Sequence, residues 1–301
     1  MPDFRSLEAF YWVAQLASFR RAAERLNMTQ SAVSQRVAAL EVRLGVRLLD
    51  RGPRTAALTP KGRQVMEHTE RLLRLRADLL SSVAAPDVFS GTLRLGVSET
   101  IVHTWLARFV ERAHTLYPLV KLDIEVDVTP RLRQGLIEQE LDLAFLLGPV
   151  NEPRVLNLEL CRYPLSFVRS PRLPMPPDPV PLSALLQVPI ITYPRTTAPY
   201  IQVEQSLRQP HLPAPRVFGN SSLSTIVRMT LDRIGVSVIP PIVIRREVAY
   251  NHLQLLRTEI ELPELVFTAS YSATPDNPVT ATLAQLARAV AADHRENDKG
   301  F

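Results

Sequence analysis

Cysteine is nearly absent from this sequence of 301 residues, which contains only Cys161 and six scattered histidines. One cysteine excludes an internal disulfide framework and a cysteine-based metal cluster, and the histidines lack the spacing of metal ligands. We therefore expect no metal site. Cys161 lies in an apolar run, without a second cysteine that could resolve an oxidised thiol. A buried, unreactive thiol is favoured over a redox sensor.

Long hydrophobic runs are missing as well. No apolar run approaches the roughly 18 residues that span a membrane, and residues 1–5 lack the pattern of a secretory signal peptide. Hydrophobic residues make up 46% of the chain and charged residues 22%, which is typical of globular proteins. At roughly 100–150 residues per domain, the length predicts two or three domains. We expect a cytoplasmic protein without a membrane partner.

The signature sequences of common enzyme classes are also absent. The chain contains no GxSxG, HExxH, P-loop or GxGxxG motif. These motifs would have indicated a nucleophilic serine, a zinc protease, a nucleotide phosphate site or a dinucleotide site. We therefore expect neither enzymatic activity nor a cofactor.

The net charge of +5 is confined to the first third of the chain. Residues 1–90 hold 14 Arg and Lys against 9 Asp and Glu, whereas residues 91–301 hold 21 of each kind. A localised positive charge favours a polyanionic partner for that part alone.

The same basic segment has the pattern of three short helices. Apolar residues recur at intervals of three and four from Phe4, and Ser18 is placed to cap a second helix over Phe19–Leu26. After a tight turn, Thr29 is placed to cap a third helix that ends at Gly45. This spacing is typical of a helix-turn-helix, whose last helix lies in the major groove of DNA.

The first turn of the third helix carries polar side chains that suit DNA recognition. Glutamine can bind adenine through two hydrogen bonds, and serine and threonine can bind bases or phosphates. The runs Val46–Leu49 and Ala56–Leu58 predict a hairpin whose arginines suit a phosphate or minor-groove contact. The candidates from these patterns are Thr29, Gln30, Ser31, Ser34, Gln35, Arg51 and Arg54. The alternative is a protein–protein module with a solvated basic face.

A longer helix follows. Thr59 and Pro60 are a cap and a first-turn proline, and the helical pattern continues to Ala85. Its apolar residues repeat every seven positions, at Val65, Leu72 and Leu79 and at Met66, Leu73 and Leu80. Such a stripe forms either a dimer seam or an intramolecular apolar face, and the length of the helix favours the seam.

From Gly91 onward, predicted strands and helices alternate, which favours an α/β fold with a mainly parallel sheet. A proline-rich stretch at Pro171–Pro181 is expected to be an exposed connector. The expected strands are Leu93–Val97, Val120–Val126, Leu141–Leu147, Leu165–Val168 and Val188–Thr192. The expected helices are Thr104–Tyr117, Arg131–Glu140 and Ser222–Arg233, and Trp105 and Tyr117 are expected in the core.

Taken together, these motifs resemble those of a known protein family. Residues 7–65 include SFRRAAERLNMTQSAVSQRVAALEVRLGVRLLDR and then LTPKG. This succession resembles the winged helix-turn-helix of LysR-type transcriptional regulators. The segments GTLRLGVSE, LYPLVKLDIEV, LIEQELDLAFLLG and DRIGVSVIPPIVI are similar, in order, to the family's effector-binding domain. The resemblance covers nearly the whole chain, more loosely after Gly148.

The resemblance implies a winged helix-turn-helix DNA-binding domain at 1–59 and a linker helix and hinge at 60–90. It further implies an α/β effector domain at 91–301, like a type 2 periplasmic binding protein. Its subdomain I would be about 91–163 and 268–301, and subdomain II about 164–267. The implied partners are double-stranded promoter DNA, a small-molecule effector and further copies of the chain, as dimers paired into tetramers.

The resemblance also implies roles for single residues. Gln30, Ser31 and Ser34 match base- and phosphate-reading positions, Arg51 and Arg54 match the wing, and Thr59 caps the linker helix beside the DNA backbone. Two departures stand out. Ser31 replaces a common proline, and Gln35 replaces a common arginine, with Arg36 following. Which residue of the pair Gln35 and Arg36 reads bases is therefore open.

In the α/β half, ligands are expected just after strands, where helix N-termini present unpaired N–H groups. The effector-binding candidates are Ser98, Thr100, Thr129, Arg131, Thr196 and Asn220. Ser98 and Thr129 also match common effector-binding positions of the family. With Arg131 or Arg195 completing the charge match, these positions favour a small organic anion. The alternative is that these residues are ordinary helix caps.

The sequence thus predicts a DNA-binding transcriptional regulator modulated by a small molecule. A solute-binding or enzymatic α/β protein with an N-terminal helical interaction module is the alternative from another class. A third possibility is a regulator of the same family that responds to no ligand.

Overall fold

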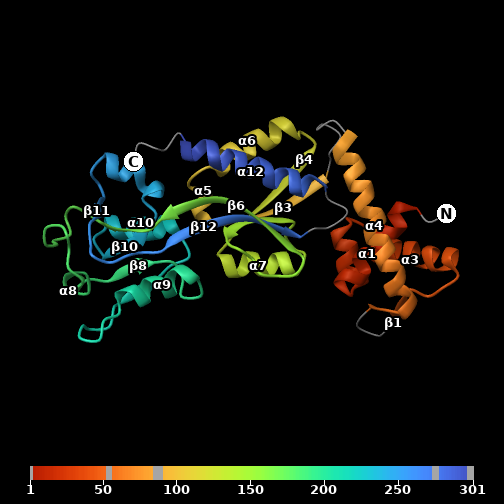
Figure 1. The fold of residues 1–301 in the computed structure, drawn as a ribbon, viewed down its shortest axis with the longest axis horizontal. Helices are drawn as coiled ribbons and strands as arrows, with labels where there is room; N and C mark the ends of the chain where they lie inside the picture. Colours follow the sequence, from red (N-terminus) through yellow and green to blue (C-terminus); the bar gives the residue numbers. More distant parts are fainter. Residues whose placement is uncertain (1–2, 52–55, 84–90, 273–277, 297–301) are drawn as a thin grey trace. The chain divides into compact units, whose positions relative to one another are not determined.

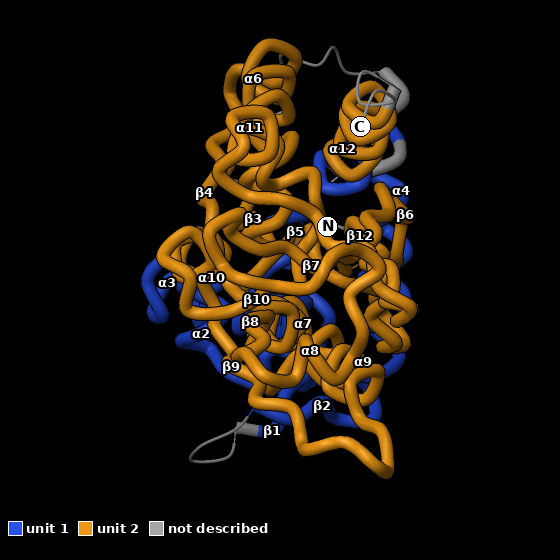
Figure 2. The backbone as a smooth tube through the Cα atoms, turned by 90° about the vertical axis from the view of Figure 1, so that its left-hand side faces the viewer, with its two compact units in different colours: residues 1–89, 273–282 blue, residues 90–272, 283–301 orange. Residues whose placement is uncertain are grey.

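A computed structural model describes residues 3–51, 56–83, 91–272 and 278–296 of the chain (Figure 1). The chain divides into two compact units (Figure 2). Unit 1 comprises residues 1–89 and 273–282, and unit 2 comprises residues 90–272 and 283–301. In the described residues, no helix combines the length and the apolar character needed to cross a membrane.

Unit 1 begins with three capped helices, as the sequence predicted. They are α1 (Phe4–Leu16), α2 (Phe19–Arg25) and α3 (Gln30–Leu44). The hydroxyl of Ser18 accepts a hydrogen bond from the backbone N–H of Arg21, and the hydroxyl of Thr29 accepts one from Ala32. The helix α3 ends at Gly45, whose φ of 68° lies in the left-handed region that favours glycine.

The hairpin of unit 1 consists of β1 (Leu49–Arg51) and β2 (Ala56–Leu58), which pair antiparallel. The first strand was expected earlier, over Val46–Leu49. It starts later because the Glu41 carboxylate of α3 accepts hydrogen bonds from the backbone N–H groups of Leu48 and Leu49, at 2.8 and 3.2 Å. The hairpin tip, with Arg54, lies outside the described residues.

The helix α4 (Pro60–Val83) begins where the sequence predicted. The Thr59 hydroxyl accepts a hydrogen bond from Gly62 N and donates one to the Arg47 carbonyl, both at 2.8 Å. A side chain at Gly62 would place its Cβ 2.0 Å from the Leu48 carbonyl oxygen, so only glycine fits here. The expected end of the helix at Ala85 lies outside the described residues.

The apolar stripe of α4 divides between two environments. Met66 and Leu73 are buried in the core of unit 1, beside Phe10, Trp12 and Leu40. This half of the stripe is therefore the intramolecular face that was the alternative interpretation. Leu72, Leu75 and Leu79 instead expose 45%, 66% and 59% of their surface.

Unit 2 contains two sheets of five strands each. One sheet has the order β4-β3-β5-β12-β6, and the other has the order β11-β7-β10-β8-β9. The strands of the first sheet are β3 (Gly91–Val97), β4 (Val120–Val126), β5 (Leu143–Leu147), β6 (Val155–Pro164) and β12 (Glu264–Ser272). Those of the second are β7 (Ser166–Arg169), β8 (Ile190–Thr192), β9 (Val217–Gly219), β10 (Val236–Ile239) and β11 (Gln254–Leu256).

The helices of unit 2 connect and cover these strands. They are α5 (Glu99–Val102), α6 (Leu106–Leu116), α7 (Thr129–Ile137), α8 (Leu182–Leu185), α9 (Ala198–Leu207), α10 (Leu223–Leu231), the 3₁₀ helix η2 (Pro241–Ile244), α11 (Arg245–Ala249) and, from residue 283 onward, α12 (Pro278–Glu296). The expected helix start at Thr104 is wrong. Its hydroxyl donates to the carbonyls of Thr100 and Ile101, which places Thr104 in the turn after α5.

The expectation of a mainly parallel sheet is also wrong. β3 pairs parallel with β4 and β5, and β8 pairs parallel with β9 and β10. However, β12 pairs antiparallel with β5 and β6, and β7 pairs antiparallel with β10 and β11. The strands β6 and β12 were not predicted, and they are long strands that lie next to the crossovers between the sheets.

Two chain crossovers separate the subdomains. The chain leaves the first sheet after β6 at Pro164 and returns to it with β12 at Glu264. The expected boundary at 268 is therefore four residues late, because Thr268 lies inside β12 and pairs with β5 and β6. Subdomain I is accordingly built on the first sheet and subdomain II on the second.

The core of subdomain I contains the expected aromatic residues. Trp105 is fully buried, and its ring centroid lies 5.4 Å from that of Phe145. Tyr117 is also buried. Cys161 is buried as expected, and burial raises the pKa of its thiol to about 11. The proline-rich connector is largely exposed, apart from Val180, which forms an isolated bridge with Thr258.

Candidate functional site

The helix α3 has a buried face and a polar face. Val33, Val37 and Leu40 are fully buried against the rest of unit 1. The predicted DNA-binding residues of α3 lie on the remaining surface. Thr29, Gln30, Ser31 and Gln35 are exposed, and Ser34 and Arg36 are half-buried. The helix can therefore present these side chains to a groove while its apolar face holds the fold together.

Two hydroxyls at the start of α3 also contact each other. Thr29 Oγ1 lies 3.0 Å from Ser31 Oγ, in addition to capping the helix. The side chains of Gln30 and Gln35 are both exposed on α3. Glutamine amides have both a donor and an acceptor, which is the combination that recognises the edge of an adenine.

The other DNA-binding candidates are placed differently. Arg51 is the last residue of β1, and Arg54 lies outside the described residues. Thr59 is only 8% exposed, and its hydroxyl bonds to Arg47 and Gly62. The structure thus confirms Thr59 as the cap of α4, and its place beside the DNA backbone stays a prediction.

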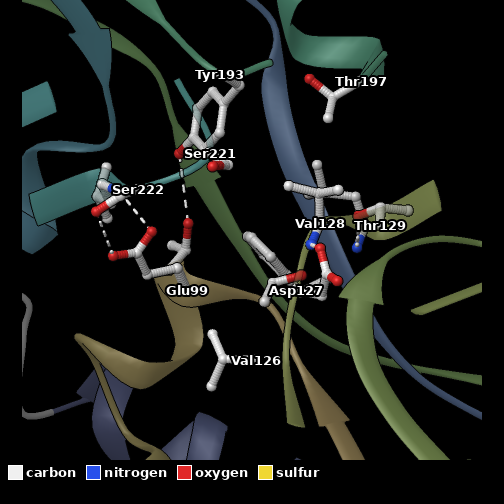
Figure 3. Close-up of a pocket in the computed structure, with 14 residues that line it drawn as sticks. Glu99, Val126, Asp127, Val128, Thr129, Tyr193, Thr197, Ser221 and Ser222 are labelled. Carbon is white, nitrogen blue, oxygen red and sulfur yellow. Dashed lines mark hydrogen bonds between the residues drawn. The ribbon is translucent and has the colours of Figure 1, made fainter. Parts of the chain in front are cut away.

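Unit 2 contains a pocket of about 330 Å³ between its subdomains (Figure 3). Its walls are the segments that follow strands β3, β4, β8 and β9, together with one residue each from β4, β5 and β12. The lining residues are Ser98, Glu99, Thr100, Val126, Asp127, Val128, Thr129, Leu147, Tyr193, Thr197, Ser221, Ser222, Leu223 and Phe267. The general prediction that post-strand segments converge on a cleft is confirmed.

Three effector-binding candidates line this pocket, namely Ser98, Thr100 and Thr129. Ser98 is 8% exposed, and its Oγ has no hydrogen-bond partner among the described residues. Thr129 Oγ1 accepts a hydrogen bond from the backbone N–H of Leu147 at 3.2 Å. Of the two hydroxyls, that of Ser98 therefore has no partner at all among the described residues, whereas that of Thr129 keeps its O–H to donate.

The other three candidates are not among the lining residues. Thr196 is exposed, and the neighbouring Thr197 lines the pocket and donates a hydrogen bond to the Pro194 carbonyl. Asn220 shapes its own turn, because its Oδ1 accepts a hydrogen bond from the backbone N–H of Ser222 at 2.8 Å.

The two arginines expected to complete the charge match do not line the pocket either. Arg131 is exposed on α7. The Arg195 guanidinium carbon lies 5.8 Å from the centre of the Tyr200 ring. The expected basic partner for an anionic effector is therefore wrong, since neither arginine reaches the cavity.

Glu99, which no sequence pattern had indicated as a site residue, joins the two subdomains. Its carboxylate accepts hydrogen bonds from the backbone N–H groups of Leu223 and Ser224 and from the Ser222 hydroxyl (Figure 3). His103 Nε2 lies 3.5 Å from the same carboxylate. A glutamate thus occupies the N-terminus of α10, where the helix dipole favours negative charge.

A second contact joins the subdomains beside Glu99. The Thr100 and Tyr193 hydroxyls lie 3.3 Å apart (Figure 3). Burial raises the pKa of Tyr193, so its hydroxyl remains protonated and can donate this hydrogen bond. The two subdomains are therefore joined beside the pocket by hydrogen bonds within the chain.

Asp127, which follows β4, was likewise not predicted as a site residue. Its Oδ1 accepts a hydrogen bond from the backbone N–H of Val128 at 2.6 Å. The pocket lining thus contains two carboxylates and no lysine or arginine. Among the described residues, no group of three or more His, Cys, Asp and Glu could hold a metal ion. The arrangement suits reversible binding of a small polar molecule.

Comparison with known proteins agrees with this architecture. Residues 4–63 match the model "Bacterial regulatory helix-turn-helix protein, lysR family", and residues 86–292 match the model "LysR substrate binding domain". The alternative of a solute-binding or enzymatic protein with an unrelated helical module does not account for the first match.

Individual relatives share parts of the chain. The SDS degradation transcriptional activation protein of a Pseudomonas strain is 40% identical over 48% of this chain and 47% of its own length. The chain therefore spans about half of that relative. The regulator YofA of Bacillus velezensis is 28% identical over 79% of this chain and 81% of its own length.

A solved structure shares the fold. The full-length regulator LysG of Corynebacterium glutamicum, with bound effector Arg, aligns with a TM-score of 0.63 at 16% identity. The alignment covers 97% of this chain and 98% of LysG. Together with the two domain matches, the fold shows that the chain belongs to the LysR family of transcriptional regulators, with an N-terminal helix-turn-helix and a C-terminal effector-binding domain.

Proposed function

We propose that this regulator binds promoter DNA through α3 as a homo-oligomer and that a small molecule in the unit-2 pocket modulates this binding. The observation that carries the proposal is the division of α3 into a buried apolar face and an exposed polar one. The excess positive charge of residues 1–90 supports the same partner.

On α3, Gln30 and Gln35 are the proposed base-reading residues, and Ser31, Ser34 and Arg36 the proposed phosphate or base contacts. Thr29 holds the start of the helix through its cap. Arg51 and Arg54 in the hairpin are proposed to contact the DNA backbone beside the groove. Hydrogen bonds from a glutamine amide to a base discriminate between bases, whereas contacts between arginine and phosphate strengthen binding to every DNA sequence alike.

Self-association is proposed to use the exposed side of α4. Leu72 and Leu75 are largely exposed on a helix whose opposite apolar residues are already buried. Exposed leucines at helical spacing favour pairing with a second amphipathic helix. Two copies would bring two recognition helices to two half-sites of the DNA. We further propose that dimers pair into tetramers.

The effector is proposed to bind between the subdomains of unit 2, with Ser98, Thr100 and Thr129 in the lining of its site. Because Glu99 and Thr100 already join the subdomains, a ligand that binds there changes the balance between open and closed forms. The site is proposed to act in the cytoplasm, where the DNA partner is found, and to carry out no enzymatic step.

The DNA-binding proposal is tested by selecting high-affinity sites from random-sequence DNA with the full chain. Binding to the selected site is then compared with binding to a scrambled site. Gln30→Ala is expected to reduce the preference by roughly 1–3 kcal/mol. Gln64→Ala is the matched control, because Gln64 is exposed on α4 and, among the described residues, its amide accepts a hydrogen bond from Lys61 alone. A full chain that binds both sites equally would contradict the proposal.

A further inference from the structure

The charge of the unit-2 pocket points to the chemical class of its ligand. Two carboxylates, those of Glu99 and Asp127, are among the lining residues, and lysine and arginine are not. An anionic ligand would meet both negative charges without a basic side chain in the lining. The inference that follows rests on the proposed function of this pocket as the effector site.

Helix N-termini do not reverse this charge. The starts of α7, α9 and α10 reach the pocket through Thr129, Thr197 and Leu223. Each helix N-terminus carries roughly half a positive charge, so three of them offset roughly one and a half of the two negative charges. The N-termini of α7 and α10 moreover already donate hydrogen bonds to these carboxylates. Val128 N–H donates to Asp127, and Leu223 N–H donates to Glu99.

Asp127 is the carboxylate that remains available. Glu99 accepts hydrogen bonds from the start of α10 through both of its oxygens. Asp127 accepts one from Val128 through Oδ1, and its Oδ2 accepts none from the described residues. Figure 3 shows Asp127 in the middle of the pocket lining, between Glu99 and Thr129.

Ser98 supplies a second, independent indication of a ligand. Ser98 is more than nine-tenths buried, and its Oγ has no hydrogen-bond partner among the described residues. Buried hydroxyls are normally hydrogen-bonded. Ser98 and Asp127 directly follow Val97 and Val126, which are register partners on the adjacent strands β3 and β4. Ser98 Oγ and Asp127 Oδ2, the two oxygens without a partner among the described residues, thus belong to neighbouring positions in one wall of the pocket.

We propose that the effector carries a positively charged nitrogen, an amine or amidine, that binds between the Asp127 carboxylate and the Ser98 hydroxyl. The N–H groups of the cation donate to Asp127 Oδ2 and to Ser98 Oγ, which then acts as an acceptor. The methylene groups of such a ligand contact Val126, Val128 and Phe267. This proposal replaces the sequence-based expectation of an organic anion with a cation.

The test compares three four-carbon probes that differ in charge, using calorimetry and thermal melting of the full chain. The probes are 1,4-diaminobutane, butane-1,4-diol and succinate. The diamine is expected to bind most tightly and to raise the melting temperature, the diol to bind weakly, and succinate not to bind. Asp127→Asn is expected to weaken diamine binding roughly tenfold to 100-fold, because it removes a charge-assisted hydrogen bond.

Asp123→Asn is the matched control, because Asp123 is an exposed residue of β4 that does not line the pocket. It makes the same change of charge and is expected to leave diamine affinity unaltered. Ser98→Ala provides a second test that changes no charge, with an expected loss of threefold to tenfold. If the Asp127→Asn variant without ligand melts at a much lower temperature than the native chain, the diamine affinity of the Ser98→Ala variant becomes the deciding measurement.

Three results would overturn the proposal. They are tighter binding of succinate than of the diamine, no diamine binding at millimolar concentration, and equal diamine affinity of the native chain and the Asp127→Asn variant. Succinate binding that Ser98→Ala abolishes would refute the cationic class and leave the pocket as the effector site. Failure to bind DNA is measured separately, so it cannot be confused with these outcomes.

Discussion

The carboxylate of Glu99 accepts a hydrogen bond from the backbone N–H of Leu223, 124 positions later in the chain. Glu99 begins α5 in subdomain I, and Leu223 begins α10 in subdomain II. A carboxylate at a helix N-terminus is stabilised by the helix dipole and by the unpaired N–H groups there. The two subdomains are therefore joined at the pocket by a residue of one that caps a helix of the other.

Glu99→Gln is expected to loosen this connection. The amide keeps the shape of the side chain but loses the charge that the start of α10 stabilises. We expect the free energy of unfolding of unit 2 to fall by about 1–2 kcal/mol. Hydrogen exchange should accelerate at the amides of Leu223 and Ser224. Glu111→Gln, on the exposed side of α6, is the control. Unchanged exchange at these two amides would contradict the interpretation.

Leu72→Asp tests the exposed side of α4. The aspartate would lie within the proposed seam, where an unpaired buried charge costs several kcal/mol. We expect sedimentation to show smaller species and operator affinity to fall, because two half-sites need two recognition helices. Arg74→Asp is the control, because two residues along a helix turn the side chain by about 200° to the other side. An oligomer unchanged by Leu72→Asp would rule out the seam.

Local features of the fold were predictable because they depend on neighbouring residues. The caps at Ser18, Thr29 and Thr59 and the stop at Gly45 follow from residues within four positions, and the structure confirms each of them. The burial of Trp105 and Cys161 was predictable for a similar reason, since both lie in apolar segments.

Features that depend on distant residues were not predictable in this way. The roles of Glu99 and Asp127 depend on how the post-strand segments of two sheets meet, and no local pattern fixes that. Thr196 was expected in the pocket where Thr197 lies, because a one-residue shift in a loop reverses which side chain faces inward. The antiparallel pairing of β12 with β6 likewise joins segments far apart in the chain.

The hairpin arginines test the electrostatic part of DNA binding. Arg51→Ala or Arg54→Ala is expected to weaken binding to selected and scrambled sites alike, because phosphate contacts carry no sequence information. Each loss should lower the slope of the logarithm of affinity against the logarithm of salt concentration by about 1. Fluorescence anisotropy over a salt series measures both effects. A variant that lost affinity only for the selected site would assign that arginine to base reading instead.

Cys161 gives a test of burial through its pKa. Burial raises the pKa of this thiol to about 11, whereas an unfolded cysteine has a pKa of about 8.5. At pH 8 the thiolate fraction is then about 0.001 in the folded chain and about 0.2 in the unfolded chain. Alkylation by iodoacetamide should therefore be more than about 100-fold slower for the native protein than in denaturant.

The same difference in pKa predicts how stability depends on pH. Because the folded thiol keeps its proton to higher pH, its contribution is complete below about pH 8.5 and declines as the pH rises toward 11. Between pH 8.5 and 9.5, below the range in which the buried tyrosines Tyr163 and Tyr193 titrate, the free energy of unfolding should fall for the native chain and stay flatter for Cys161→Ala. Equal pH dependence of the two chains, or rapid alkylation of the folded protein, would show that the thiol reaches solvent and would reopen a redox role.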